Sequence, residues 1–307
     1  MRRNSGRAIQ ALSEILHGQI VAAFGRQYLA RLENGSEMLC LTRGKKSEVV
    51  CGDLVEIKLT GDASTENDAQ GVIERISPRR SLLHRSDAFR EKLIAANVTQ
   101  IVIVVAAEPS FSDELLARCL VAAYDQKLDV LIVLNKCDLA GAATAARQRL
   151  MPYTAIGYRV LELSAKQDVS ALRPFLANHT SVLVGQSGMG KSTLINALLP
   201  DAQAATREIS SALDSGKHTT THARLYRLDA DSSLIDCPGV QAFGLHHLSF
   251  GGIEQGFIEF AQYLGQCRFH DCHHSHEPGC ALREAVAAGK IDARRLELFR
   301  QIAANKA

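Results

Sequence analysis

A glycine-rich segment at residues 185–192, with the sequence G-Q-S-G-M-G-K-S, constrains this chain of 307 residues more than any other feature. It matches the phosphate-loop pattern G-x-x-x-x-G-K-[ST], and its flanks predict a buried strand before it and a helix after it. Glycines in the loop permit backbone angles that are closed to other residues, so that successive N–H groups can surround an anion at the helix start. We therefore interpret the segment as a phosphate-binding loop and not as an ordinary glycine-rich turn. The residues assigned to it are Gly185, Gln186, Ser187, Gly188, Met189, Gly190, Lys191, Ser192 and Thr193.

A second motif, N-K-C-D, follows the apolar run at residues 130–134, which predicts a buried parallel strand. A carboxylate at Asp138 can accept hydrogen bonds from N1–H and N2–H₂ of guanine, whereas adenine offers no matching pair of donors. Alone, this motif would more simply be a solvated turn at a strand end. A further strand-like run at residues 158–163 ends in S-A-K, which is suited to contact guanine O6, and the two strand ends together favour a base site. Its predicted residues are Asn135, Lys136, Cys137, Asp138, Ser164, Ala165 and Lys166.

The order of the two motifs is the reverse of that in ordinary small GTPases, because the base-reading segment precedes the phosphate loop. The chain therefore has the organisation of a circularly permuted GTPase. Permutation is tolerated where the original termini lie close together. Strand-like and helix-like segments alternate through this region, which predicts an α/β fold with a mostly parallel sheet.

Two further segments are predicted to act on the terminal phosphate and its Mg²⁺. Lys191 is expected to contact the β- and γ-phosphates and Ser192 to hold Mg²⁺. Asp236 and Gly239, in the sequence D-C-P-G, are expected to contact the Mg²⁺ through water and the γ-phosphate, respectively. One threonine of the run 219–221 would complete the Mg²⁺ shell, and we favour Thr220 over Thr219 and Thr221, although the run could also be a polar loop without this role.

The position that follows Gly239 holds an apolar residue, Val240, where Ras-type enzymes carry a glutamine that orients the attacking water. Hydrolysis by the chain alone is therefore expected to be slow. His247 is the nearest residue that could orient the water by hydrogen bonding, and the alternative is a surface histidine beside His246.

Cysteine and histidine residues cluster near the C-terminal end of the sequence. Cys267, Cys272, His274 and Cys280 would form a closed tetrahedral Zn²⁺ site, which is structural because no coordination position remains for a water molecule. The nearby His270, His273 and His276 compete for the histidine position, and three reduced cysteines in a polar loop are the alternative to a metal site.

Composition and patterning divide the chain into three expected parts. Short β-like runs between residues 18 and 76 predict a small barrel of the OB type, for which an SH3-like barrel is the alternative. The expected domains are residues 1–79 with a basic N-terminal arm, 80–245 for the GTPase and 246–307 for a helical zinc-binding module. A net charge of +2 does not by itself indicate nucleic acid. The sequence has neither a signal peptide nor an apolar run of about 18 residues, so a cytoplasmic protein without a membrane partner is expected, and nothing suggests a dimer.

Taken together, these motifs resemble the ribosome small subunit-dependent GTPases, the RsgA (YjeQ) family, over nearly the whole chain. The resemblance implies GTP hydrolysis to GDP in late maturation of the small ribosomal subunit, stimulated by that subunit. It also implies that His247 orients the water, that the barrel and zinc module contact ribosomal RNA, and that other assembly factors can be partners. The alternatives are a permuted GTPase with another RNA or ribosomal client, and an RNA-binding module with vestigial nucleotide binding, against which intact Lys191, Ser192 and Asp236 argue.

Overall fold

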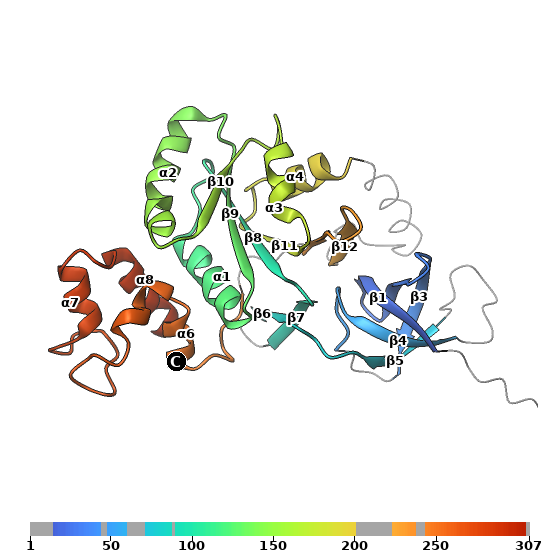
Figure 1. Cartoon of the computed structure of the whole chain (residues 1–307), viewed down its shortest axis with the longest axis horizontal. Coiled ribbons are helices and arrows are strands. Elements are labelled where there is room, and N and C mark those ends of the chain that lie inside the picture. The colour runs from blue at the N-terminus through green and yellow to red at the C-terminus, as the bar shows by residue number, and fades with distance from the viewer. Residues whose placement is uncertain are drawn as a thin grey trace, which may run out of the picture.

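Three parts of the molecule follow one another in a row, with a barrel at one end, a sheet with helices on both faces in the middle, and a group of helices at the other end (Figure 1). The computed structural model describes residues 15–43, 48–59, 71–87, 90–200, 223–237 and 243–304. Within these ranges no helix has the length and apolar character that a membrane span requires.

The N-terminal part is a closed five-stranded barrel, which confirms the predicted OB-type fold. Its strands pair in the order β1-β2-β3-β5-β4, and β4 pairs back with β1. The barrel has its own buried cluster, which includes Ile20, Val55 and Ile57. The strands are β1 (Ile15–Phe24), β2 (Gln27–Leu32), β3 (Glu37–Thr42), β4 (Leu54–Leu59) and β5 (Gly71–Ile76).

The central sheet contains the parallel strands that the apolar runs predicted. The order is β10-β9-β8-β11-β13-β12, with neighbouring strands parallel except for β12, which is antiparallel to β13. Every residue of β8 is buried, as expected for a strand covered on both faces. A bridge between Ala22 and Arg224 joins β12 to β1 of the barrel. The strands are β8 (Gln100–Ala106), β9 (Asp129–Asn135), β10 (Arg159–Glu162), β11 (Thr180–Val184), β12 (Arg224–Arg227) and β13 (Ser233–Asp236).

Helices connect these strands, and a separate hairpin links the barrel to the sheet. Ser112 begins the first helix, since its hydroxyl accepts a hydrogen bond from the backbone N–H of Leu115. The hairpin strands are β6 (Leu82–Asp87) and β7 (Arg90–Ala96). The helices are α1 (Asp113–Asp125), α2 (Ala140–Ala155), the short η1 (Ser170–Leu172), α3 (Arg173–Leu176) and α4 (Lys191–Leu198).

The C-terminal helices pack against α1 and share the buried core of the central sheet. Their own centre is aromatic, because the rings of Phe257 and Phe260 stack 5.1 Å apart and both meet the edge of Phe299. A Cβ added to Gly256 would lie 2.9 Å from the Val121 side chain, so only glycine allows this close approach to α1. The elements are α6 (Phe250–Gln255), η2 (Ile258–Tyr263), α7 (Ala281–Ala287) and α8 (Ala293–Ala304).

Candidate functional site

A cavity of about 510 Å³ lies at the carboxyl edge of the parallel sheet, and both sequence motifs line it. The base-reading motif follows β9, the S-A-K segment follows β10 and the phosphate loop follows β11, so parallel strands bring three distant segments to one edge. A volume of this size suits a small-molecule ligand. The predicted residues that line it are Asn135, Lys136, Asp138, Ser164, Ala165, Lys166, Ser187, Gly188, Gly190, Lys191, Ser192 and Thr193.

The phosphate loop has the backbone that its glycines were predicted to provide. Gly185, Gly188 and Gly190 have φ angles of 150°, 82° and 93°, which L side chains rarely adopt. The Lys191 ammonium donates to the carbonyl oxygens of Gly185 at 2.6 Å and Gln186 at 2.8 Å, so the side chain lies folded back over its own loop.

A buried amide joins the base-reading motif to the phosphate loop. Asn135 Nδ2 donates to the Met189 carbonyl at 2.9 Å, and its Oδ1 accepts from the backbone N–H of Ala165 at 2.9 Å. A Cβ on Gly190 would lie 2.3 Å from this Nδ2 atom. Three segments that are far apart in the sequence are therefore held together by one side chain, on a residue that is 1 % exposed.

Two side chains of the base-reading loop face the cavity. Lys136 has a left-handed backbone, with φ of 63°, and its ammonium donates to the Glu108 carbonyl at 2.7 Å. The pKa of the Asp138 carboxyl is lowered, first by the Ser164 hydroxyl and further by its own backbone N–H, Lys166 and Lys136. No hydrogen bond of ordinary geometry engages the Ser164 hydroxyl among the described residues, so we interpret this effect as a nearby dipole. Asp138 is held as an anion that can accept hydrogen bonds from a ligand.

Asp236 and Lys191 influence each other beside the phosphate loop. Burial raises the pKa of Asp236, and Lys191 partly offsets this; burial lowers the pKa of Lys191, and Asp236 partly offsets that. The half-buried carboxylate at the end of β13 and the Ser192 hydroxyl are hard oxygen donors of the kind that Mg²⁺ prefers.

Cys137, Gln186 and Met189 do not line the cavity themselves but support it from behind. The backbone N–H of Cys137 donates to the Leu163 carbonyl at 3.2 Å, which ties the base-reading loop to the end of β10. The Gln186 side chain accepts from the backbone N–H of Ser112 at 2.7 Å, a contact that sequence reasoning did not find because nothing in the spacing pairs these residues.

The structure places His247 away from the phosphate loop. Its Nε2 lies 3.3 Å from Asp125 Oδ2, and its ring centre lies 5.2 Å from that of His84. Asp125 ends α1, whereas Ser112, beside the phosphate loop, begins it, and a helix of 13 residues is roughly 20 Å long. For His247 to orient the attacking water, as predicted, its side chain would therefore have to move toward the phosphate loop. Thr219, Thr220, Thr221, Gly239 and Val240 lie outside the described residues.

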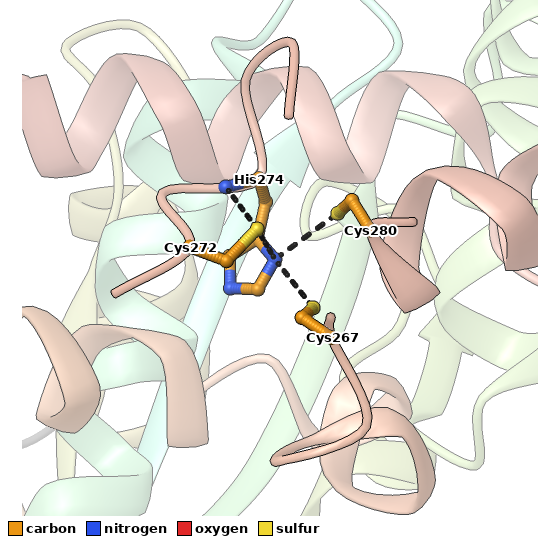
Figure 2. A group of neighbouring side chains, drawn as sticks. All are labelled: Cys267, Cys272, His274 and Cys280. Atoms are coloured by element: carbon orange, nitrogen blue, oxygen red, sulfur yellow. Dashed lines mark hydrogen bonds between the residues drawn. The ribbon is translucent and has the colours of Figure 1, made fainter. Parts of the chain in front are cut away.

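The four predicted metal ligands converge between η2 and α7 (Figure 2), and their donor atoms all lie within 4.8 Å of one another. His274 Nδ1 lies 3.6 Å from Cys267 Sγ, 3.7 Å from Cys272 Sγ and 3.3 Å from Cys280 Sγ. Tetrahedral Zn²⁺ with ordinary bond lengths would require nitrogen-to-sulfur distances of about 3.6 Å. The donor set therefore fits Zn²⁺, and His274 is the histidine that the structure brings to the cysteines.

Polar groups around the cluster orient its donors. The backbone N–H groups of His274 and Ala281 donate to Cys272 Sγ and Cys267 Sγ, each at 3.4 Å. The other ring nitrogen of His274 lies 2.5 Å from Glu254 Oε1, which leaves Nδ1 to face the sulfur atoms. A carboxylate in this place fixes the ring and its tautomer. No sequence pattern connects Glu254 with the ligands, so the sequence did not indicate it.

Comparison with known proteins agrees with this geometry. The family model described as RsgA GTPase matches residues 76–246. A small ribosomal subunit biogenesis GTPase RsgA from Nitrosospira multiformis is 54 % identical over 303 residues, covering 99 % of this chain and 95 % of that protein. The crystal structure of YjeQ from Thermotoga maritima superposes with a TM-score of 0.70 at 27 % identity, covering 95 % of this chain and 99 % of that one. That of YloQ, described as a circularly permuted GTPase, gives a TM-score of 0.68 at 25 % identity and covers 97 % of this chain and 96 % of that one.

Proposed function

This chain belongs to the RsgA family of GTPases, and we propose that it hydrolyses GTP in late maturation of the small ribosomal subunit, to which it binds through ribosomal RNA. The observation that carries the proposal is a cavity lined by both the base-reading and the phosphate-binding residues. The relative from Nitrosospira multiformis, which is named a small ribosomal subunit biogenesis GTPase, matches along almost its whole length.

Base selection is assigned to Asp138, whose carboxylate would accept from N1–H and N2–H₂ of guanine. An adenine ligand would leave this carboxylate without donors, and sites of this kind discriminate by about 10⁴-fold or more. Asn135 positions the loop through its bonds to Met189 and Ala165, and the Lys136 stem would lie along the base. Ser164, Ala165 and Lys166 complete the base site.

Phosphate binding is assigned to the backbone of the loop and to Lys191. The ammonium of Lys191 would exchange its present carbonyl partners, Gly185 and Gln186, for the β- and γ-phosphates. Ser192, Asp236 and Thr220 would hold Mg²⁺, which neutralises charge that develops on the phosphates. The backbone N–H of Gly239 is assigned to the γ-phosphate.

Slow hydrolysis by the free protein would follow from two features. Val240 cannot orient water, and His247 is engaged with Asp125. Binding to the small subunit would release His247 toward the γ-phosphate, which makes the subunit an activator. The Zn²⁺ of the C-terminal module would be structural, because Cys267, Cys272, Cys280 and His274 fill its four positions.

Measurement of GTP turnover tests the proposal. We expect slow turnover alone, a large acceleration by purified small subunits and little effect of large subunits or bulk RNA. Lys191→Ala should abolish both rates, and Asp138→Asn should shift preference from GTP toward xanthosine triphosphate. Turnover that small subunits leave unchanged would refute the ribosomal role, and equal binding of ATP and GTP would refute the base assignment.

A further inference from the structure

The first turn of α1 contains a buried carboxylate that two other helices contact. The side chain of Asp113 is 4 % exposed, and Arg149 of α2 lies 3.0 Å from its Oδ1 atom. Arg294, in the first turn of α8, contacts the Oδ2 atom. Neither oxygen accepts a hydrogen bond of ordinary geometry among the described residues, so this buried carboxylate is stabilised by the two guanidinium charges beside it. The nucleotide chemistry proposed for the cavity does not use it.

The segment that leads into this turn contacts the nucleotide cavity at three points. The Glu108 carbonyl accepts from Lys136 of the base-reading loop at 2.7 Å. The Pro109 ring lies 3.4 Å from where a Cβ on Gly188 would stand, and the Ser112 N–H donates to Gln186 at 2.7 Å. Residues 108–113, which we call the strut, therefore lie against both halves of the site.

Arg149 makes the strut rigid along its length. Its guanidinium donates to Ser110 Oγ at 2.5 Å and to the Phe111 carbonyl at 2.7 Å, and it lies 4.0 Å above the Phe111 ring. A displacement of Asp113 would therefore move the strut as a unit, including its contacts with the phosphate loop.

Arg294, which contacts Asp113, belongs to a part of α8 that is fixed within the C-terminal module. Arg295, next to Arg294, forms a buried ion pair with Glu259 at 2.6 Å, and its guanidinium lies 5.1 Å from the Tyr153 ring of α2. The first turn of α8 is thus held in place on the surface of the GTPase part. The side chain of Arg294 is 67 % exposed, and it contributes to this interface through its contact with the Asp113 carboxylate.

We propose that Asp113 is a positioning residue that couples the C-terminal module to the nucleotide site. Arg294 pairs with Asp113, which is the last residue of the strut. The strut in turn contacts Gln186 and the base-reading loop. The position of α8 therefore sets the affinity for guanine nucleotide, and by reciprocity bound nucleotide stabilises the docking of α8. A partner that engages the C-terminal module would change nucleotide affinity by this route. The inference rests on the proposed guanine nucleotide site but not on the ribosomal role.

Titration of a fluorescent GDP analogue into the zinc-loaded, full-length chain tests the coupling. Arg294→Ala should weaken binding by about 3- to 10-fold, a range typical of mutations that act on coupling between sites. Arg294→Lys should restore part of the loss. Arg283→Ala is the matched control, because Arg283 donates to the Glu277 carbonyl within the same module, and the affinity of this variant should equal that of the parent.

Two further measurements separate coupling from a general loss of stability. In a Gln186→Ala background, Arg294→Ala should have a smaller effect on affinity, since the strut has lost its hydrogen bond to the phosphate loop. In the unmodified chain, GDP should slow hydrogen exchange in α8. This measurement tests the coupling between nucleotide and α8 even if the arginine variants fold poorly.

Three results would each overturn the inference. The first is a folded Arg294→Ala variant that binds GDP as the parent does. The others are an undiminished effect of Arg294→Ala in the Gln186→Ala background, and hydrogen exchange in α8 that GDP leaves unchanged. Failure of the parent chain to bind guanine nucleotide at all would instead overturn the proposed function.

Discussion

At the scale of single residues, the nucleotide site depends on positions where no other residue fits. Gly190 is one of them, since its φ is 93° and a Cβ would lie 2.3 Å from the Asn135 amide nitrogen. Gly190→Ala should therefore break the Asn135–Met189 bond, abolish GTP binding and reduce the free energy of unfolding by about 1–3 kcal/mol. Calorimetric titration with GTP and urea unfolding measure the two effects.

A matched control comes from Gly141, which is helical and has nothing within 4 Å of an added Cβ. Gly141→Ala should leave GTP affinity unchanged and raise the free energy of unfolding by up to about 1 kcal/mol, because alanine favours a helix. A Gly190→Ala protein that binds GTP as the parent does would contradict the close packing of Gly190 against Asn135.

Burial of Asp236 in the site lowers the stability of the folded protein, and this effect depends on pH. Burial raises its pKa above the usual 3.8 even though Lys191 opposes the shift, so this carboxyl binds its proton more tightly in the folded state than in the unfolded chain. Stability from this group is complete below the unfolded pKa and is lost as pH rises through the folded pKa. Asp236→Asn should therefore raise the melting temperature of the nucleotide-free protein at neutral pH while abolishing Mg²⁺-dependent hydrolysis. Thermal melts across pH measure this, and a gain that persists unchanged below the unfolded pKa would contradict it.

At the scale of elements, the sequence predicts the parts whose patterns are local. Apolar runs predict β9 and β11, and the residues after the phosphate loop predict α4. The β6–β7 hairpin was not predicted, because tertiary contacts specify it: Leu82 N–H donates to the Gln126 side chain, and Cys51 bridges to Ala95. Neither partner is near in the sequence.

The same distinction applies to the site. Motif residues that follow parallel strands were predicted to meet because the ends of such strands share an edge. Glu254 and Asp113 belong to no motif, and their partners, His274 and Arg294, lie in other elements of the chain. Only the fold identifies them.

The contact between α6 and the metal cluster gives a prediction at this scale. Glu254→Ala removes the carboxylate 2.5 Å from His274 Nε2, which should weaken Zn²⁺ affinity by about 10- to 100-fold, as is typical for such partners. Competition with a chromophoric chelator measures the affinity. Glu284→Ala on α7, an exposed position, is the control and should retain parent affinity. Equal Zn²⁺ affinity of the two variants would remove Glu254 from the metal site.

At the scale of the whole molecule, the three parts are not equally independent. The barrel has a buried cluster of its own and contributes four residues to the core that the C-terminal helices and the central sheet share, namely Val21, Ala22, Leu29 and Cys51. The barrel joins the sheet through the bridge at Ala22 and through close contacts near Gly52, where an added Cβ would lie 2.1 Å from the Ala96 carbonyl oxygen. Loss of order should therefore spread from the C-terminal helices into α1 sooner than into the barrel.

Removal of the metal tests this arrangement. Binding of structural Zn²⁺ contributes about 10–16 kcal/mol in isolated zinc fingers, so its loss should release much of the loop that carries the ligands. Chelation should accelerate hydrogen exchange in residues 250–304 and, through Gly256 and Val121, in α1, while β1 to β5 keep their protection. Zinc added back should restore the original pattern. Exchange that increases equally in the barrel would show that all three parts unfold as one unit, and exchange that changes nowhere would show that the aromatic centre around Phe299 supports the module without metal.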